Sequence, residues 1–141
     1  MRLKYMTDIK GDYMRAVICG TGSAVPDKVL DNEELSQMVE TNDEWIRERT
    51  GIAQRHIAKE DTCVSLAVKA AKSALEQAEI PAEDIDLLIV STISSNVVLP
   101  CTACEVQKEI GAVHAVAYDL SAACTGFVMA YQSAQSFLQA G

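Results

Sequence analysis

One continuous apolar run constrains the fold more than any other feature of this sequence. Residues 86–93 read Asp-Leu-Leu-Ile-Val-Ser-Thr-Ile, without the polar and apolar alternation of a half-exposed strand. We therefore expect a central strand that is covered on both faces. A short helix from about Pro100 to Ile110 and a strand from His114 to Leu120 follow it. This order of elements predicts two parallel strands joined by a right-handed crossover.

Further segments continue the alternation of strands and helices. Residues 15–20 (Arg-Ala-Val-Ile-Cys-Gly) predict a buried strand that enters a glycine-rich turn. Residues 31–41 begin with short polar residues and acids, which favours a helix that ends near Thr41. A longer helix from Asp61 to the Ile80-Pro81 pair carries a stripe of alanines, which predicts close packing. With a last helix over residues 124–139, the pattern indicates an α/β fold.

Composition and charge narrow the class of protein. The 141 residues, 49% of them hydrophobic, can bury a core the size of one ordinary domain, and we expect a soluble, globular chain. A formal net charge of -8 gives no reason to expect a nucleic-acid partner, and no apolar run is long enough to span a membrane. Five cysteines without a secretory signal predict reduced thiols in a cytoplasmic protein.

The two ends of the chain differ from its middle. Residues 1–13 show neither strand alternation nor a helical period, so we expect a non-native or disordered leader and a translation start at Met14. Residues 14–141 then form one incomplete α/β half-domain. The chain closes on a helix where the alternation would continue into a strand. We therefore expect a sheet that lacks a neighbour and apolar faces that stay uncovered.

Cys124 is the strongest candidate for a catalytic residue. It follows the predicted strand that ends at Leu120, where the last helix begins, and its neighbours Ala122, Ala123 and Gly126 are small. A thiol in the first turn of a helix lies at the positive end of the helix dipole, which favours the nucleophilic thiolate. The alternative is a buried cysteine that acts as a small hydrophobic residue.

Trp45 is the strongest candidate for ligand binding. It is the only tryptophan of the chain and lies close in sequence to Arg47, Arg49 and Arg55. An indole face and a guanidinium plane can hold an adenine between them, and arginine also attracts phosphate. The alternative is a tryptophan that packs on the core at a helix end beside solvated charges.

The remaining histidines and cysteines offer weaker candidates. His114 opens the strand that leads to Cys124, which places it roughly 20 Å from the thiol, and we expect a structural role for His56. Cys101 and Cys104 are three residues apart on one helix face, which favours buried packing. A structural zinc site needs four ligands, so the sequence predicts no metal site.

Four segments, in order, resemble the 3-oxoacyl-[acyl-carrier-protein] synthase III family, which starts bacterial fatty acid synthesis. They are residues 20–26 (Gly-Thr-Gly-Ser-Ala-Val-Pro), residues 41–52 (Thr-Asn-Asp-Glu-Trp-Ile-Arg-Glu-Arg-Thr-Gly-Ile), residues 55–57 (Arg-His-Ile) and residues 119–127 (Asp-Leu-Ser-Ala-Ala-Cys-Thr-Gly-Phe). The resemblance runs from about Met14 to Gly141. It implies a thiolase-like fold of two similar α/β halves in layers of helix and sheet, normally a homodimer, of which this chain resembles the first half.

The resemblance also implies a reaction. In this family the cysteine takes an acyl group from acyl-CoA, which is a substrate and not a cofactor, so we expect no cofactor. A histidine and an asparagine from the second half then assist condensation with malonyl-acyl carrier protein. Neither partner lies in this chain, and we therefore expect the 141 residues alone not to catalyse condensation.

The resemblance also implies catalytic and binding roles for particular residues. Cys124 would be the acylated nucleophile. Trp45 and Arg49 would flank the adenine of CoA, and Thr41 would form a hydrogen bond nearby. Leu99 matches the position that reaches across the dimer interface to bound the acyl pocket of the partner. A leucine replaces the aromatic residue of some relatives, so the choice of acyl primer stays open, as does an ordinary interface role for Leu99.

Two other functions compete with this interpretation. A related condensing enzyme, such as a hydroxymethylglutaryl-CoA synthase or a type III polyketide synthase, has similar architecture, although the segment from Trp45 to Arg49 argues against it. A non-catalytic fragment that serves only as an interaction module is the other alternative.

Overall fold

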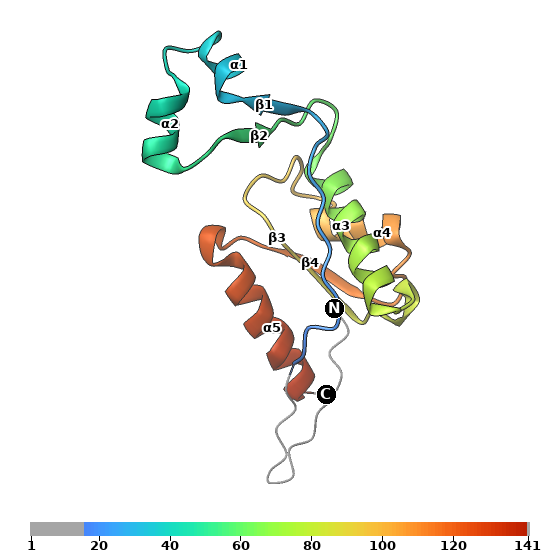
Figure 1. The fold of residues 1–141 in the computed structure, drawn as a ribbon. Helices are drawn as coiled ribbons and strands as arrows, with labels where there is room; N and C mark the ends of the chain where they lie inside the picture. Colours follow the sequence, from blue (N-terminus) through green and yellow to red (C-terminus); the bar gives the residue numbers. More distant parts are fainter. Residues whose placement is uncertain (1–15, 141) are drawn as a thin grey trace. The chain divides into compact units, whose positions relative to one another are not determined.

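A computed structural model of the chain describes residues 16–140 (Figure 1). The expected leader and the expected start at Met14 lie outside these residues. The described chain divides into two compact units. The second unit is Val25–Thr62, and the first contains the residues before Val25 together with those from Cys63 onward.

The first unit is built on two parallel strands. Strands β3 (Leu87–Ser91) and β4 (Val116–Leu120) pair from Leu87 opposite Val116 to Ser91 opposite Leu120. Helix α4 (Thr102–Ile110) connects them, after a loop that contains a cis peptide bond between Leu99 and Pro100. The predicted strand–helix–strand unit is confirmed. The second strand starts at Val116, two residues later than expected, because His114 lies in the preceding turn.

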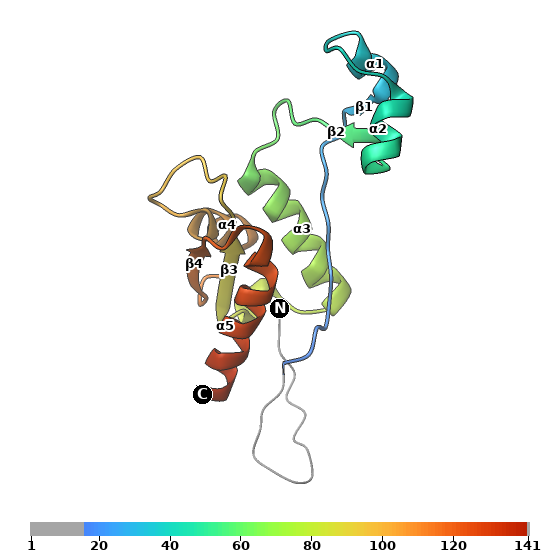
Figure 2. The same ribbon diagram turned by 90° about the vertical axis from the view of Figure 1, so that its left-hand side faces the viewer.

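Helices pack against this small sheet from both sides. Helix α3 (Cys63–Ala78) packs beside α4, and α5 (Gly126–Ala140) runs along β3 on the opposite side of the sheet from α4 (Figure 2). Short 3-10 turns, η1 (Ala82–Asp84) and η2 (Ala123–Thr125), precede β3 and α5. The core of this unit includes buried Ile85, Ala112 and Ala115, which precede the two strands, with half-buried Leu75, Ile80, Leu88 and Ile110.

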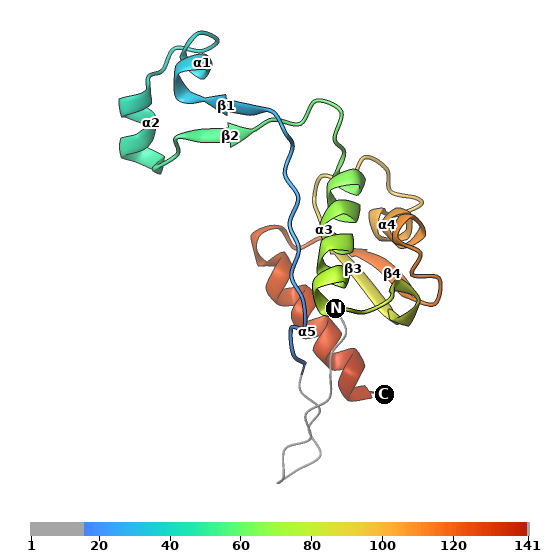
Figure 3. The same cartoon turned by 45° about the vertical axis from the view of Figure 1, so that its right-hand side comes forward.

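The predicted close packing of the alanine stripe is confirmed. The extended segment that contains Gly20 and Gly22 runs along α3 (Figure 3). A Cβ atom at Gly22 would lie 2.6 Å from the backbone nitrogen of Ala74, and one at Gly20 would lie 2.9 Å from the Cβ of Ala78. Backbone and helix approach this closely only because glycine faces alanine.

The predicted strand over residues 15–20 is wrong for the part that the structure describes. Residues 16–20 are not assigned to a strand, and Val17 and Ile18 are exposed. A strand needs a neighbouring strand that completes its hydrogen-bond ladder, whereas this segment lies beside a helix. Ala16 instead donates to Gln135 at 2.7 Å and accepts from Tyr131 at 3.0 Å, both of which belong to α5.

The second unit holds elements that the sequence predicted poorly. Strands β1 (Val29–Asp31) and β2 (Gln54–His56) pair antiparallel, and α1 (Asn32–Ser36) and α2 (Asp43–Thr50) lie between them in the chain. The predicted helix over residues 31–41 therefore ends early. Asn42 adopts an extended conformation to cap α2, so a helix through Thr41 would leave α2 without its cap.

An apolar groove of about 900 Å³ crosses the first unit between α3, β3 and α5. The residues that line it include Ala71, Ala74, Leu75, Leu88, Ala134 and Phe137. The sequence predicted a strand that is covered on both faces, but β3 is half-buried, because within residues 16–140 the groove leaves part of one face open. Among the helices of residues 16–140, none combines the length and apolar character that a bilayer crossing requires.

Candidate active site

Cys124 lies at the junction of strand and helix, as the sequence predicted. Leu120 ends β4, the single 3-10 turn η2 places Cys124 at its centre, and α5 begins two residues later at Gly126. The thiol therefore precedes the first turn of α5 and does not belong to it. Its side chain is exposed to solvent. An exposed thiol at the start of a helix is open to attack a substrate and lies near the positive end of the helix dipole.

The turn that presents Cys124 has an uncommon backbone. Ala123 adopts a φ of 43°, in the left-handed region that residues with a Cβ atom rarely occupy. The amide and the hydroxyl of Thr125 both donate to the carbonyl of Ala122, at 3.1 and 2.8 Å. These two bonds hold the turn closed around Cys124. Strained backbone of this kind is frequent where a protein must present one side chain to a ligand.

Gly126 lets the helix start against the sheet. A Cβ atom at this position would collide with the Oγ of Ser91, at the end of β3, and would lie 3.0 Å from its Cβ. Close packing against Ser91 thus explains why residue 126 is a glycine. It allows the backbone of α5 to approach the carboxyl end of β3.

Asp119 fixes the end of the strand that leads to Cys124. Its carboxylate accepts hydrogen bonds from the backbone amides of Thr102 at 2.9 Å and Ala103 at 2.7 Å. These are the first two residues of α4, whose N-cap residue Cys101 makes no side-chain cap. Asp119 therefore caps α4 from β4. Sequence reasoning missed this role, although a lone carboxylate in an apolar strand is a signal for it.

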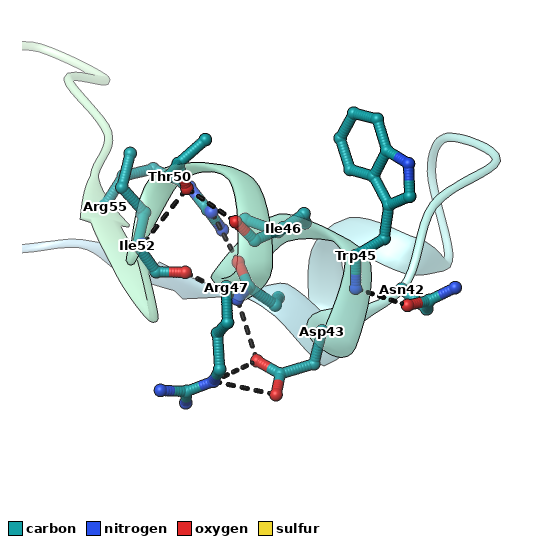
Figure 4. A network of polar contacts seen from close by, with 9 residues as sticks. Asn42, Asp43, Trp45, Ile46, Arg47, Thr50, Ile52 and Arg55 are labelled. Atoms are coloured by element: carbon teal, nitrogen blue, oxygen red, sulfur yellow. Dashed lines mark hydrogen bonds and ion pairs between the residues drawn. The ribbon is translucent and has the colours of Figure 1, made fainter.

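The second unit carries the candidate residues for nucleotide binding. The side chain of Asn42 accepts a hydrogen bond from the backbone amide of Trp45 at 2.8 Å and so caps the start of α2 (Figure 4). At the other end of the helix, the C-cap residue Gly51 has a φ of 71°. Trp45 is 50% exposed, and Thr41, just before the cap, is half-buried. Ile46, one residue after Trp45, is the buried residue of this helix. Half of the Trp45 side chain is thus open to solvent, which is more than a tryptophan packed on the core would expose.

Trp45 and Arg49 already stack on each other. The guanidinium carbon of Arg49 lies 4.6 Å from the centre of the indole ring, one helical turn away on α2. Each stacked layer takes about 3.5 Å, so an adenine between them needs roughly 7 Å. The Arg49 side chain therefore has to swing outward before a base can enter. This pair is a preassembled cation–π contact and not an open slot.

A polar network centred on one buried side chain, Asn32, lies beneath this helix. Asn32 is 1% exposed, and its amide nitrogen donates to the carboxylate of Asp43 and to the carbonyl of Ile52, both at 2.8 Å. The Asn32 oxygen accepts from Arg55 at 2.5 Å, and Arg55 also donates to the carbonyl of Leu30 at 3.1 Å. The network thereby joins α1, α2 and both strands. Sequence reasoning missed Asn32 because polar residues at a helix start read as exposed caps.

Asp43 connects this network to the surface. Arg47 donates to both of its carboxylate oxygens, at 2.8 and 2.7 Å (Figure 4). The Asn32 amide, followed by Arg47, holds the pKa of the Asp43 carboxyl below its ordinary value of 3.8. Of the three arginines near Trp45 in sequence, Arg47 and Arg55 are thus engaged within the unit, and Arg49 is the one that stacks on the indole.

The structure also describes the two histidines and Leu99. His56 donates from Nδ1 to the carbonyl of Pro26 at 2.6 Å, as expected of a structural histidine. His114 lies in the turn at the start of β4, while Cys124 follows the other end of that strand. Leu99 is 89% exposed in the loop before α4. In the described part of the chain, no three or more His, Cys, Asp or Glu side chains gather as metal ligands would.

The sequence of this chain is similar to those of curated proteins that share one name. Beta-ketoacyl-[acyl-carrier-protein] synthase III of Clostridium botulinum (strain 657 / Type Ba4) is 48% identical over 122 residues, which cover 86% of this chain and 37% of that protein. The enzyme of the same name from Desulfotalea psychrophila is 48% identical over 126 residues, 89% of this chain and 39% of that protein. No family model matches the chain.

Solved structures agree with the sequence relatives. The crystal structure of 3-oxoacyl-[acyl-carrier-protein] synthase III from Aquifex aeolicus VF5 matches with a TM-score of 0.85 and 46% identity, over 88% of this chain and 40% of that one. The corresponding structure from Pseudomonas aeruginosa PAO1 gives a TM-score of 0.81 and 40% identity, over 89% and 38%. The chain thus spans about two fifths of the length of the proteins that it matches.

Proposed function

Since this chain belongs in sequence and fold to the beta-ketoacyl-[acyl-carrier-protein] synthase III family, of whose members it spans about two fifths, we propose that it is the cysteine-bearing part of an acyltransferase that starts fatty acid synthesis. The observation that carries this proposal is the exposed thiol of Cys124 in the turn between β4 and α5, within a sequence that resembles the nucleophile segment of the family. The related condensing enzymes are not favoured, because the curated relatives reported above are synthases III.

The proposed first step is transfer of an acyl group from acyl-CoA. The Cys124 thiolate attacks the carbonyl carbon of the thioester, and the backbone amide of Cys124 helps to bind the developing oxyanion. The carbon–sulfur bond to CoA then breaks, and CoA leaves as a thiolate that takes up a proton. The acyl group stays on Cys124 as a new thioester.

The proposed second step needs groups that this chain does not supply. Decarboxylation of malonyl-acyl carrier protein and condensation use a histidine and an asparagine in the family. His56 is bound to a backbone carbonyl of its own unit, and His114 lies at the far end of β4 from Cys124. Neither is placed to act as the missing group. The 141 residues therefore support acyl transfer to Cys124 but not condensation.

CoA recognition is assigned to α2 and its start. Trp45 would stack on one face of the adenine, Arg49 would swing out and close on the other face, and Thr41 would form a hydrogen bond nearby. The exposed indole and its contact with the guanidinium support this role. When the contact between Trp45 and Arg49 opens, each side chain stacks on the adenine in place of the other. This new stacking offsets part of the free energy that the opening costs.

Leu99 is assigned to the acyl pocket of a partner subunit in a cytoplasmic homodimer. Its nearly complete exposure, together with that of neighbouring Val98, is expected of residues that reach into another chain. A leucine at this place leaves room for a primer larger than acetyl, and the size of residue 99 should then influence the choice of acyl chain.

Intact mass spectrometry tests the acyl-transfer proposal. The chain is incubated with acetyl-CoA, and a single acetyl adduct that maps to Cys124 is the expected result. The Cys124→Ser variant should acquire no thioester, whereas the matched Cys63→Ser variant should be acetylated like the parent. Absence of any adduct on the folded chain would overturn the assignment of Cys124 and favour a non-catalytic fragment.

A reconstitution assay tests the condensation step. Malonyl-carrier-protein-dependent product is measured for the 141 residues alone and for the same chain co-expressed with the remaining part of a family member. We expect product from the mixture only, and none from a mixture that contains Cys124→Ser. Turnover by the chain alone at the rate of a whole family member would contradict the division of the site.

A further inference from the structure

A second thiol site lies away from the proposed nucleophile. The Sγ atoms of Cys101 and Cys104 are 3.3 Å apart, and both side chains are half-buried. Cys101 is the N-cap residue of α4, and Cys104 is the third residue of that helix. The spacing of three residues puts both side chains on one face. Among the cysteines of residues 16–140, no other pair brings its sulfur atoms into contact.

The surroundings give the two thiols different characters. The Cys101 thiol donates to Cys104, and the Cys104 thiol points to the carbonyl of Ala117 on β4 at 4.0 Å. The hydrogen bond with Cys101, followed by burial, raises the pKa of the Cys104 thiol. Asp119 adds to this effect because its carboxylate occupies the start of α4. Cys104 therefore stays protonated longer than an ordinary thiol.

Metal binding does not account for the pair. A zinc site needs four ligands, and no third His, Cys, Asp or Glu side chain joins these two thiols in a metal-binding group within residues 16–140. The two sulfur atoms converge and are instead arranged for bond formation with each other. A disulfide requires a separation of about 2.0 Å, so small rotations of the two side chains close the remaining gap.

We propose that Cys101 and Cys104 form a reversible dithiol–disulfide site that hydrogen peroxide oxidises. This inference does not rest on the acyl-transfer function, since neither cysteine takes part in it. Both residues are half-buried, which favours an oxidant of this size over large ones. Cys101 reacts first because it lies at the start of the helix, and Cys104 resolves the intermediate.

The chemistry balances with peroxide as the only oxidant. Cys101 Sγ attacks one peroxide oxygen, the O–O bond breaks, and the thiol proton leaves with the second oxygen as water. Cys101 is now a sulfenic acid. Cys104 Sγ attacks this sulfur, the S–O bond breaks, and the proton of Cys104 leaves with the hydroxyl group as a second water. The two sulfurs together lose two electrons, and the peroxide is reduced to two water molecules.

Peptide mapping tests the proposal directly. Trypsin releases residues 73–108 as one peptide, which contains Cys101 and Cys104 and no other cysteine. The chain in a Cys124→Ser background is treated with hydrogen peroxide, and its remaining free thiols are alkylated under denaturing conditions. We expect this peptide to lose both alkylation sites and two hydrogen atoms, and to regain both sites after reduction with a phosphine.

Matched variants decide whether the pair itself is responsible. Cys101→Ser and Cys104→Ser should each abolish the lighter peptide, while Cys19→Ser and Cys63→Ser should leave it unchanged. The lighter peptide together with this pattern supports the site. Retention of both free thiols in residues 73–108 while Cys19 or Cys63 is oxidised would overturn it, and so would disulfides that link Cys101 or Cys104 to other cysteines in place of each other.

Discussion

The two units of this chain hold their candidate functional residues in opposite ways. In the second unit, Trp45 and Arg49 stand on the exposed side of a regular helix, and the buried Asn32 side chain below fixes that helix through its hydrogen bonds. In the first unit, Cys124 is presented by the backbone itself, through the positive φ of Ala123 and the close approach that Gly126 permits. One site depends on side chains that lie beneath it, and the other on the path of the main chain.

The difference follows from how much apolar core each unit has. Leu30 and Ile46 are the buried hydrophobic residues of the second unit, which has too few residues for an ordinary hydrophobic core. Its polar network around Asn32 therefore contributes a large share of its stability. The first unit buries Ile85, Val106 and several alanines below a sheet. It can support a strained turn because packing elsewhere offsets the cost.

The largest expected effect is that of Asn32→Ala on the second unit. The change leaves the Arg55 guanidinium and the Asp43 carboxylate without their buried partner, and we expect a loss of about 3 kcal/mol in the free energy of unfolding. Urea unfolding followed by the fluorescence of Trp45 measures this, because the only tryptophan of the chain lies in this unit. Arg47→Ala is the control, since it removes an exposed ion pair and should cost less than about 1 kcal/mol. Equal losses for the two variants would contradict the expectation that Asn32 stabilises the unit more than the exposed ion pair does.

Trp45→Ala should weaken binding without unfolding the unit. Stacking of a base on an aromatic ring contributes about 2 kcal/mol in nucleic-acid complexes, so the Kd for CoA should rise about 30-fold. Calorimetric titration measures the Kd, and circular dichroism follows the thermal unfolding. Trp45→Phe keeps an aromatic face and should retain most of the affinity. A collapse of thermal stability with an unchanged Kd would make Trp45 a structural residue.

Gly126→Ala should destabilise the first unit, because the presentation of Cys124 depends on the close approach of the α5 backbone to β3. The added methyl group meets Ser91 at the end of β3, and we expect a loss of about 1 to 2 kcal/mol from overpacking. Thermal unfolding measures the loss, and the rate at which iodoacetamide labels Cys124 reports the turn. The double variant with Ser91→Ala should recover part of the stability. Full stability with unaltered labelling would show that the turn tolerates movement of α5.

The smallest expected effect is a dependence of the second unit on acid pH. Because the pKa of Asp43 is lowered on folding, its contribution to stability is fully present above the ordinary value of 3.8 and is lost as the pH falls through the lower folded value. Unfolding of the parent and of Asp43→Asn, followed by fluorescence of Trp45, should give curves that differ above about pH 4 and converge below it. A constant difference between the two curves across this range would exclude the titration of Asp43 as the cause.

Local sequence patterns were enough to predict the strand–helix–strand unit of β3, α4 and β4, the helix α3, and the place of Cys124 between strand and helix. These follow from local patterns: a continuous apolar run, a stripe at helical spacing, and small residues around a thiol. The resemblance that these segments carried is confirmed by relatives at 48% identity.

Other features became known only from the three-dimensional structure. It showed that residues 16–20 meet a helix and not a strand, that Asn32 is buried, that Asp119 caps α4, and that Arg49 stacks on Trp45 while Arg47 and Arg55 bind elsewhere. Each of these facts depends on a partner that lies at another place in the chain. The neighbouring residues in the sequence do not show whether a hydrogen-bonding side chain is solvated or buried. That depends on whether the fold brings a partner to it.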